Sequence, residues 1–107
     1  MRWIIPALAA LAVCSTSAFA AGDAAAGKKK AIKCSVCHGM NGIAKNPLSS
    51  NLAGQSAIYL DRSMKAYKTG ERKNEQMSVI APALTDEDIA DLAAYYSSIK
   101  ITVEVPK

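Results

Sequence analysis

The sequence predicts an all-α fold in which three main helices are joined by long loops. Apolar residues recur at helical spacing in three segments, which begin near residues 23, 56 and 85, and no segment shows a convincing strand pattern. Helices of about 12 to 15 residues are each marginal alone in water. The three helices therefore need a common object to pack against.

The first 20 residues have the layout of a secretory signal peptide and are not expected to belong to the fold. Arg2 gives a positive start, an apolar run extends over residues 3–13, and Ala18-Phe19-Ala20 is a small-x-small cleavage site. The apolar run is 11 residues long, shorter than the roughly 20 residues that span a membrane. Lipidation at Cys14 is an alternative, although Val13 departs from the usual lipoprotein pattern.

Cleavage after Ala20 would leave residues 21–107 as a single domain of 87 residues. This mature chain keeps two cysteines, Cys34 and Cys37, and one histidine, His38. Small domains bury a lower fraction of their surface than large ones, and many depend on a disulfide, a metal or a cofactor. We therefore expect an additional element of this kind in the core.

The charge distribution bears on the class of partner. The 13 Lys+Arg and 9 Asp+Glu give the whole chain a net charge of +4, and loss of Arg2 leaves +3. Basic residues are not interleaved with stacking aromatic residues, so no nucleic-acid partner is expected. Lysines precede the cysteines at positions 28, 29, 30 and 33. They fit a solvated helix face or, alternatively, a basic surface that steers an acidic partner.

The first helix is predicted to begin after Asp23, a good N-cap, and to continue through the reactive residues. One helical stripe contains small residues followed by the reactive ones, at Ala24, Gly27, Ala31, Cys34 and His38. Gly27 costs about 1 kcal/mol relative to Ala in a helix interior. We therefore expect another helix to pack closely against Gly27.

The other two helices have recognisable boundaries. Ser56 caps a helix that runs to about Gly70, with an apolar side made of Leu60, Met64 and Tyr67. Thr85 and Asp88 resemble a capping box at the start of the last helix. The apolar face of the last helix consists of Ile89, Leu92, Ala93, Tyr96 and Ile99. Residues 39–55 and 71–84 lack an apolar period and are predicted to be loops.

The stretch C-S-V-C-H, residues 34–38, gathers two thiols and the imidazole, and two classes of site fit it poorly. A structural zinc site needs four Cys or His ligands, and residues 21–107 contain three. A thiol–disulfide oxidoreductase carries C-x-x-C at the start of a helix. Here the pair falls at the predicted end of a helix, where the helix dipole disfavours a thiolate.

Covalent haem attachment fits the stretch best, because C-x-x-C-H is the signature of c-type haem. Each thiol adds across one vinyl group of the porphyrin, and the histidine that follows directly is then held beneath the iron. We therefore predict one haem c per chain, attached through Cys34 and Cys37, with His38 as an iron ligand.

The second axial ligand is predicted from the methionines, because residues 21–107 contain no second histidine. Met40 lies too close to His38 in sequence to reach the opposite face of the ring. Met64 falls on the apolar side of the middle helix, where methionine often fills a core. Met77 lies between the middle and last helices and is the predicted iron ligand. An open or water-bound iron is the alternative.

Several segments resemble the small class I c-type cytochromes, in particular the bacterial monohaem type related to each half of the periplasmic dihaem cytochromes. The resemblance covers essentially all of residues 21–107 and rests on G-D-A-A-A-G-K at 22–28, C-S-V-C-H-G at 34–39, N-L-A-G-Q at 51–55, Y-L at 59–60, G-E-R-K-N-E-Q-M at 70–77 and L-T-D-E-D-I-A-D-L-A-A-Y-Y at 84–96. It implies the cytochrome c fold, with its first and last helices crossed near Gly27 and Met77 as the sixth ligand.

The resemblance also implies that a loop carbonyl accepts a hydrogen bond from the ring of His38. Relatives usually carry a proline where this chain has Ser50, which leaves the identity of that carbonyl open, with Pro47 as the first candidate. The haem pocket is expected to be lined by Ile43, Leu48, Leu52, Leu60, Met64, Tyr67, Ile80 and Leu92.

Together these features predict a soluble periplasmic one-electron carrier and not an enzyme. Its partners would be redox proteins, possibly with acidic faces, that Lys33 and Lys45 orient near Cys37. We expect a monomer or weak dimer without stable membrane insertion after signal cleavage. The alternatives are the cytochrome subunit of a larger periplasmic dehydrogenase complex, and a haem enzyme or sensor with a displaceable sixth ligand.

Overall fold

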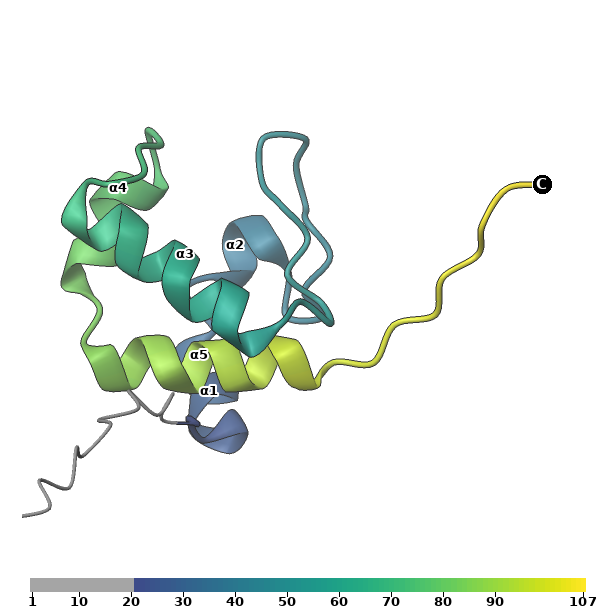
Figure 1. Cartoon of the computed structure of the whole chain (residues 1–107), viewed down its shortest axis with the longest axis horizontal. Coiled ribbons are helices and arrows are strands. Elements are labelled where there is room, and N and C mark those ends of the chain that lie inside the picture. Colours follow the sequence, from purple (N-terminus) through teal and green to yellow (C-terminus); the bar gives the residue numbers. More distant parts are fainter. Residues whose placement is uncertain (1–20) are drawn as a thin grey trace, which may run out of the picture.

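The computed structural model describes residues 21–107, so the predicted signal peptide lies outside the described residues. Residues 21–107 form helices and loops and contain no strand, which confirms the all-α prediction (Figure 1). In chain order the elements are α1 (Ala24–Lys30), α2 (Ser35–His38), α3 (Ala57–Thr69), α4 (Met77–Ile80), the 3-10 helix η1 (Ala81–Ala83) and α5 (Asp86–Ser98).

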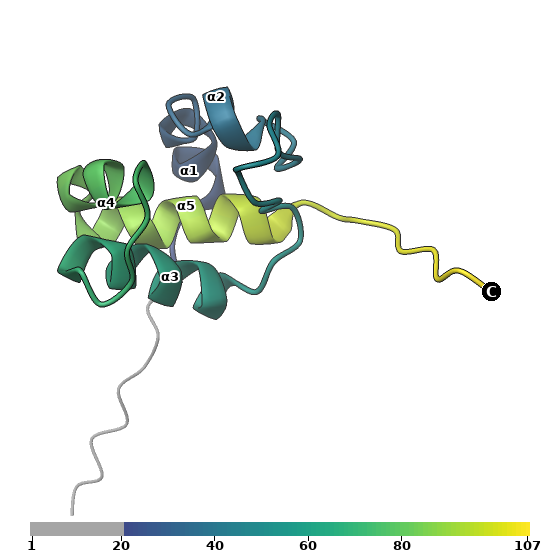
Figure 2. The same ribbon diagram turned by 90° about the horizontal axis from the view of Figure 1, so that it is seen from above.

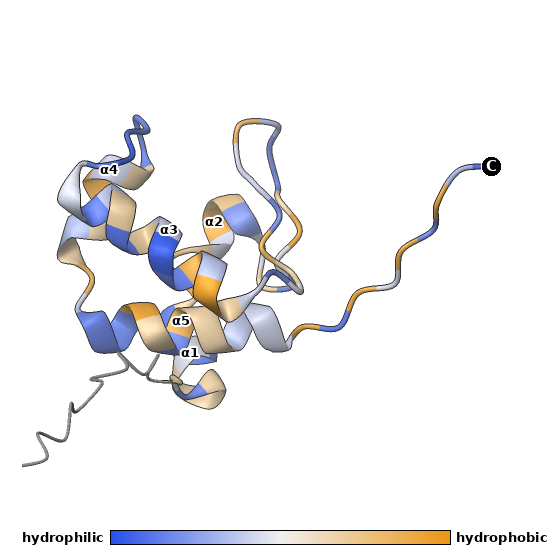
Figure 3. Cartoon of the chain, viewed as in Figure 1, coloured by the Kyte–Doolittle hydropathy of each residue, from blue (hydrophilic) through white to orange (hydrophobic). Residues whose placement is uncertain are grey.

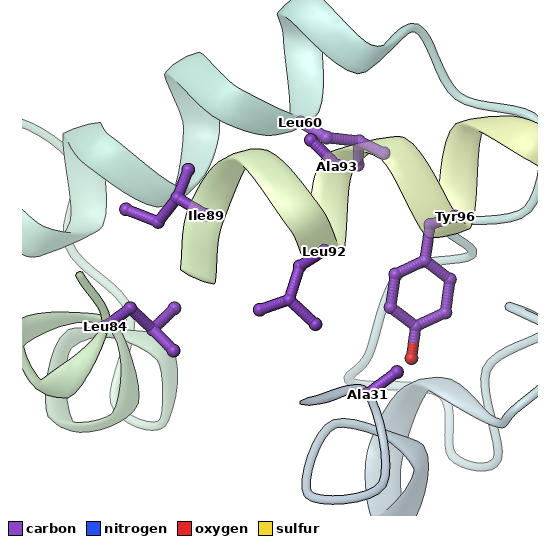
Figure 4. Packing of buried hydrophobic residues seen from close by; sticks show 7 residues of the cluster. All are labelled: Ala31, Leu60, Leu84, Ile89, Leu92, Ala93 and Tyr96. Atoms are coloured by element: carbon purple, nitrogen blue, oxygen red, sulfur yellow. The ribbon is translucent and has the colours of Figure 1, made fainter. Parts of the chain in front are cut away.

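Helix α5 is the element against which α1 and α3 pack. Its first turn is fixed by the predicted capping box: Thr85 Oγ1 accepts from the Asp88 N–H at 3.0 Å, and Asp88 Oδ2 accepts from the Thr85 N–H at 3.0 Å. Helices α1 and α3 lie on different sides of α5 (Figure 2). The buried core gathers along α5 and consists of Ala31, Leu60, Leu84, Ile89, Leu92, Ala93 and Tyr96 (Figure 4).

Helix α1 crosses α5 at backbone contact. A Cβ atom added at Gly27 would lie 1.9 Å from the carbonyl oxygen of Asp91 and 2.8 Å from Cβ of Tyr95. Gly22 approaches α5 equally closely, since a Cβ there would lie 2.1 Å from the Ala90 carbonyl oxygen. The predicted close approach at Gly27 is confirmed, and the absence of a side chain at both glycines makes it sterically possible.

The predicted continuous helix from Asp23 to His38 is wrong. Helix α1 ends at Lys30, residues 31–34 form turns, and α2 begins at Ser35. Within the turn Ser35 Oγ donates to the Ile32 carbonyl at 2.6 Å, and such local side-chain bonds compete with a regular helix. Figure 2 shows α2 displaced from α1 as a result.

Helix α3 begins and ends where predicted. Ser56 Oγ accepts from the Tyr59 N–H at 3.4 Å, and Gly70 ends the helix in the left-handed conformation with φ +82°. Leu60 on its inner side is buried against α5.

The predicted loop 71–84 is partly helical, because it contains α4 and η1. Asn74, in the hydrophilic segment that leads into α4 (Figure 3), binds the backbone at the start of this helix. Its Oδ1 accepts from the N–H groups of Gln76 and Met77, both at 3.0 Å, and its own N–H donates to Ser78 Oγ at 2.9 Å. Elements of four and three residues are too short to show a helical period, so the sequence pattern missed them.

After Ile99 the chain leaves α5 and extends away from the helices (Figures 1 and 2). Residues 101–107 are exposed along their whole length, and apolar and polar residues alternate in them (Figure 3). Across residues 21–107, none of the helices has the length and apolar character needed to cross a membrane.

An ion-pair cluster links α1 to α5 where the two helices cross. Lys30 Nζ lies 2.7 Å from Asp91 Oδ2 and 3.0 Å from Asp88 Oδ1, and the Asp23 N–H donates to Asp91 Oδ1 at 2.8 Å. Hydrogen bonds from Lys30 and Asp23 lower the pKa of the Asp91 carboxyl. Hydrogen bonds from Thr85 and Lys30 lower the pKa of Asp88 to about 2, and the two carboxylates raise the pKa of Lys30.

Gly27→Ala should destabilise the haem-loaded protein by at least about 2 kcal/mol, despite the better helix propensity of alanine, because the new methyl group meets backbone of α5. Gly70→Ala is the matched control. Its Cβ would meet nothing within 4 Å, so only the left-handed φ opposes the substitution, at a cost of about 1 kcal/mol. Denaturant unfolding measures both, and equal losses would contradict the close crossing.

Asp91→Asn should weaken the dependence of stability on acid pH. Both aspartates have folded-state pKa values below the ordinary 3.8, so their contribution is complete above about pH 4 and is lost as the pH falls through the folded values, about 2 for Asp88. Lys30 has a raised pKa, so its contribution is complete below 10.5 and is lost above it.

The measurement is the denaturant midpoint of the haem-loaded protein between pH 2 and pH 7. Asp86→Asn is the control, because Asp86 is an exposed carboxylate of α5 outside the Lys30 cluster. An unchanged acid slope in Asp91→Asn would show that the cluster does not stabilise the crossing.

Candidate functional site

A cavity of about 160 Å³ lies where α2, α3, α4 and α5 face one another. Six of the eight residues predicted to line it do so: Leu52, Leu60, Met64, Tyr67, Ile80 and Leu92. Ile43 and Leu48 do not, and they are 48% and 85% exposed. Both belong to the 39–55 loop, whose tip turns away from the helices, so their predicted role in the pocket is wrong.

All four predicted site residues line this one cavity: Cys34, Cys37, His38 and Met77. The turn at residues 31–34 directs α2 towards the cavity, whereas Met77 enters it from α4. The structure therefore brings two thiols, an imidazole and a thioether together from segments about 40 residues apart in sequence.

The ring of His38 is oriented by a carbonyl of the 39–55 loop. Its Nδ1 lies 2.7 Å from the carbonyl oxygen of Ser50, so Pro47, the first candidate, is wrong. Because a carbonyl oxygen only accepts, Nδ1 carries the proton, and Nε2 is left free to bind a metal. Ser50 thus supplies the carbonyl at the position where relatives carry proline.

The path of the loop explains why Ser50 reaches His38. Gly42 has φ +73°, and its carbonyl accepts from the N–H groups of Leu52 and Ala53 at 2.7 and 3.0 Å. Asn51 Oδ1 also accepts from the Ala44 N–H at 2.7 Å. These bonds fold the loop back on itself, so residues 50–52 lie against the cavity. They join residues far apart in the loop, and for this reason sequence spacing did not reveal them.

Two tyrosines of α5 hold the backbone that follows His38. Tyr96 Oη donates to the Gly39 carbonyl at 3.2 Å, and Tyr95 Oη donates to the Met40 carbonyl at 2.5 Å. Burial raises the pKa of Tyr96, so this phenol stays protonated as a donor. Met40 packs against the core and does not line the cavity, which leaves Met64 and Met77 as its methionines.

The thiols do not have the character of a redox pair. Burial raises the pKa of Cys34, which disfavours the thiolate needed for disulfide exchange. The prediction that the pair lies at the end of a helix was wrong, because Cys34 is the N-cap of α2. The conclusion against an oxidoreductase nevertheless stands, with burial as its reason.

The side chains also argue against zinc. Within residues 21–107, no three His, Cys, Asp or Glu side chains are grouped closely enough to hold a metal ion. A structural zinc ion requires four such ligands in a tetrahedron.

The cavity fits a covalently attached haem. Its lining combines the attachment thiols and a correctly oriented imidazole with an apolar wall from α3 and α5. The planar ring therefore provides the common object against which three short helices pack.

Polar residues of the cavity were missed by the sequence prediction. They are Ser50, Asn51, Gln55, Tyr59, Ser63, Arg72 and Gln76. Tyr59, Ser63 and Tyr67 are spaced four residues apart in α3 and thus share one face, a signal that was available in the sequence. Arg72 and Gln76 lie in the segment before α4 and gave no such signal.

Comparison with known proteins agrees with this site. The cytochrome c family model matches residues 24–100. The chain is 53% identical over 81 residues to cytochrome c-554(548) of Halomonas halodenitrificans, which covers 73% of this chain and 98% of that protein. It is 45% identical over 86 residues to cytochrome c4 of Pseudomonas aeruginosa, which covers 80% of this chain and 43% of that protein.

A solved structure shows the same fold. The crystal structure of reduced recombinant cytochrome c4 from Pseudomonas stutzeri superposes with a TM-score of 0.71 at 38% identity, covering 78% of this chain and 48% of that chain. The chain thus spans less than half the length of these cytochrome c4 relatives. A thiosulfate dehydrogenase electron acceptor of Stutzerimonas stutzeri is 36% identical over 70 residues, covering 63% of this chain and 32% of that protein.

The family match extends over most of the chain, and Cys34 and Cys37 fit its haem attachment motif. The chain therefore belongs to the cytochrome c family: it carries covalently attached haem c and serves electron transport.

Proposed function

We propose that this chain is a periplasmic one-electron carrier whose haem c is attached through Cys34 and Cys37 and whose iron is bound by His38 and Met77. The observation that carries the proposal is the gathering of these four side chains in one cavity, with His38 held in the tautomer that leaves Nε2 free. The haem supplies the one-electron exchange between Fe(III) and Fe(II).

Each ligand has a protein group that fixes it. The Ser50 carbonyl accepts from Nδ1 of His38 at 2.7 Å, which orients the ring and strengthens Nε2 as a donor. Asn74 accepts from the Met77 N–H at 3.0 Å and so holds the start of α4 at the cavity. A soft thioether ligand in an apolar pocket favours Fe(II) and raises the reduction potential. Two firmly held ligands also keep the geometric change between the oxidation states small.

The proposed domain organisation is a signal peptide, residues 1–20, followed by one monohaem domain, residues 21–107. Three observations support it. Gly22 packs on Ala90 and Asp23 caps α1, so residues within three positions of the predicted cleavage site already belong to the fold. The 81 residues aligned with cytochrome c-554(548) make up 98% of that protein, so the relative is little longer than the aligned segment. The attachment motif occurs once.

Electrons would leave near Cys37, where α2 lies at the surface. Ile32 and Val36 are 66% and 72% exposed there. Lys33 is exposed and lines the cavity, and the Lys45 N–H donates to the Cys37 carbonyl at 2.8 Å, which keeps exposed Lys45 beside α2. An apolar patch with lysines around it suits brief docking of an acidic-faced redox protein.

A second candidate function is that of an electron-accepting subunit of a larger dehydrogenase. It is favoured by the similarity to a thiosulfate dehydrogenase electron acceptor. The site residues would be the same in both cases. Recovery of a stable complex with a dehydrogenase from periplasmic extract would favour the subunit, whereas a free haem protein would favour the carrier.

Met77→Ala should abolish the weak long-wavelength methionine-to-iron charge-transfer band of the ferric protein and permit carbon monoxide to bind the ferrous protein. Met64→Leu is the matched control: Met64 lines the same cavity but packs against the core, so the band should persist. The measurement is the visible spectrum of each haem-loaded variant, which shows whether the charge-transfer band is present.

Two results would contradict the assignment. A band that survives in Met77→Ala and vanishes in Met64→Leu would make Met64 the ligand. A high-spin wild-type protein without the band would indicate an open iron and would favour an enzyme or a sensor over a carrier.

A further inference from the structure

Arg72 lies at the edge of the cavity and forms none of the ion pairs seen in residues 21–107. Among residues 21–107, no aspartate or glutamate lines the cavity, whereas Lys33 and Arg72 do. The ion pairs seen in this part of the chain join Lys30 to Asp88 and Asp91, and Lys65 to Asp61, so none involves Arg72. A cavity with positive charge and no carboxylate is suited to a ligand that brings its own negative charge.

The backbone after α3 determines where Arg72 lies. Gly70 takes φ +82° at the end of the helix, and the Arg72 N–H then donates back to the Ala66 carbonyl at 3.0 Å. This reversal lays the guanidinium over the ring of Tyr67, with Cζ 4.8 Å from the ring centroid. The stacking orients the planar group, whose N–H donors lie in its own plane.

Two hydroxyl-bearing residues of α3, Tyr59 and Ser63, line the cavity together with Arg72. Tyr59 and Ser63 precede Tyr67 by two turns and one turn of the helix, and all three line the cavity. Arg72 lines this cavity too, and hydrogen bonding from Arg72 and then Ser63 lowers the pKa of the Tyr59 phenol. Guanidinium and hydroxyl donors thus line the same cavity, with Tyr59 and Arg72 exposed at its edge.

We propose that Arg72, together with Tyr59 and Ser63, forms a binding corner for a carboxylate of the haem and thereby raises the reduction potential. Haem carries two propionate side chains, and these are its only anionic groups. The corner supplies the forked donor that binds a carboxylate through two bonds. The proposal rests on haem occupying this cavity, as the proposed function requires, and does not depend on which methionine binds the iron.

The effect on potential follows from charge. Reduction adds one electron to the iron, so a nearby cation stabilises Fe(II) relative to Fe(III), and a carboxylate left without its cation does the opposite. Loss of Arg72 removes the cation and exposes the charge of the carboxylate, and both changes lower the potential. The group is a positioning and tuning residue and takes no part in ligating the iron.

The test compares Arg72→Gln with Lys73→Gln in the haem-loaded protein by spectroelectrochemical titration. Both variants lose one positive charge at adjacent positions, but Lys73 lines a shallow surface depression with Lys68 and Asn74, and not the cavity. Arg72→Gln should shift the Fe(III)/Fe(II) equilibrium towards Fe(III) on the order of threefold or more beyond the shift in Lys73→Gln. Equal shifts in the two variants would overturn the proposal.

A second readout separates binding of the carboxylate from a general structural effect. Without its cation the carboxylate has a higher pKa, so the pH range in which the potential varies should move upwards in Arg72→Gln and remain in place in Lys73→Gln. Arg72→Lys should recover most of the potential, and it replaces the glutamine variant if that protein fails to mature. Tyr59→Phe should lower the potential slightly without any change of charge.

The charge-transfer band of each variant shows whether the iron ligands are intact. A wild-type protein without the band would refute Met77 as ligand. The reduction potentials of Arg72→Gln and Lys73→Gln could still be compared, because the carboxylate corner does not depend on the sixth ligand. An intact band with identical potentials and pH profiles in both glutamine variants would refute the carboxylate corner and leave the proposed carrier function in place.

Discussion

The close crossing of α1 over α5 at Gly27 is the constraint on which the rest of the structure depends. Backbone contact at this point is possible because Gly27 has no side chain, and the Lys30 cluster with Asp88 and Asp91 closes the contact at the end of α1. The crossing buries Ala31 completely, so the turn that follows begins from a fixed point. From there α2 carries both thiols and the imidazole to the cavity, and the tyrosines of α5 bind the two carbonyls after His38.

The opposite side of the cavity depends on local hydrogen bonds. Helix α3 lays an apolar face on α5 and ends at Gly70, whose left-handed conformation turns the chain back towards the cavity. Asn74 then accepts from the N–H groups of Gln76 and Met77 and holds the start of α4 there. One side of the site is thus fixed by helix packing and the other by a short capped segment. Such a division suits an electron carrier in the cytochrome c family, because both segments that carry the proposed iron ligands are held before any partner binds.

Charge is distributed in accord with this architecture. In the acidic first turn of α5, Asp88 completes the capping box and pairs with Lys30, so it stabilises the fold. The cavity, by contrast, has cations at its edge and no acid among the described residues. The charges that link α1 to α5 are therefore separate from those at the cavity, and a substitution in one group need not disturb the other.

The sequence by itself determined the features that arise from neighbours within a few residues. The caps at Asp23, Ser56 and Thr85 and the stop at Gly70 are local hydrogen-bond and backbone preferences, and all four were found where predicted. The attachment motif likewise specified the haem, because its chemistry lies within five consecutive residues. Gly27 also indicated a close helix crossing, because the low helix propensity of glycine has to be offset by close packing.

Tertiary structure alone decided the rest, because it depends on contacts between distant segments. Ser50 rather than Pro47 bonds to His38, owing to loop bonds that spacing does not reveal. Exposure at the loop tip removed Ile43 and Leu48 from the pocket, although both are as apolar as the residues that line it. Arg72 has no periodic pattern around it, and its place at the cavity follows from the reversal of the chain after Gly70.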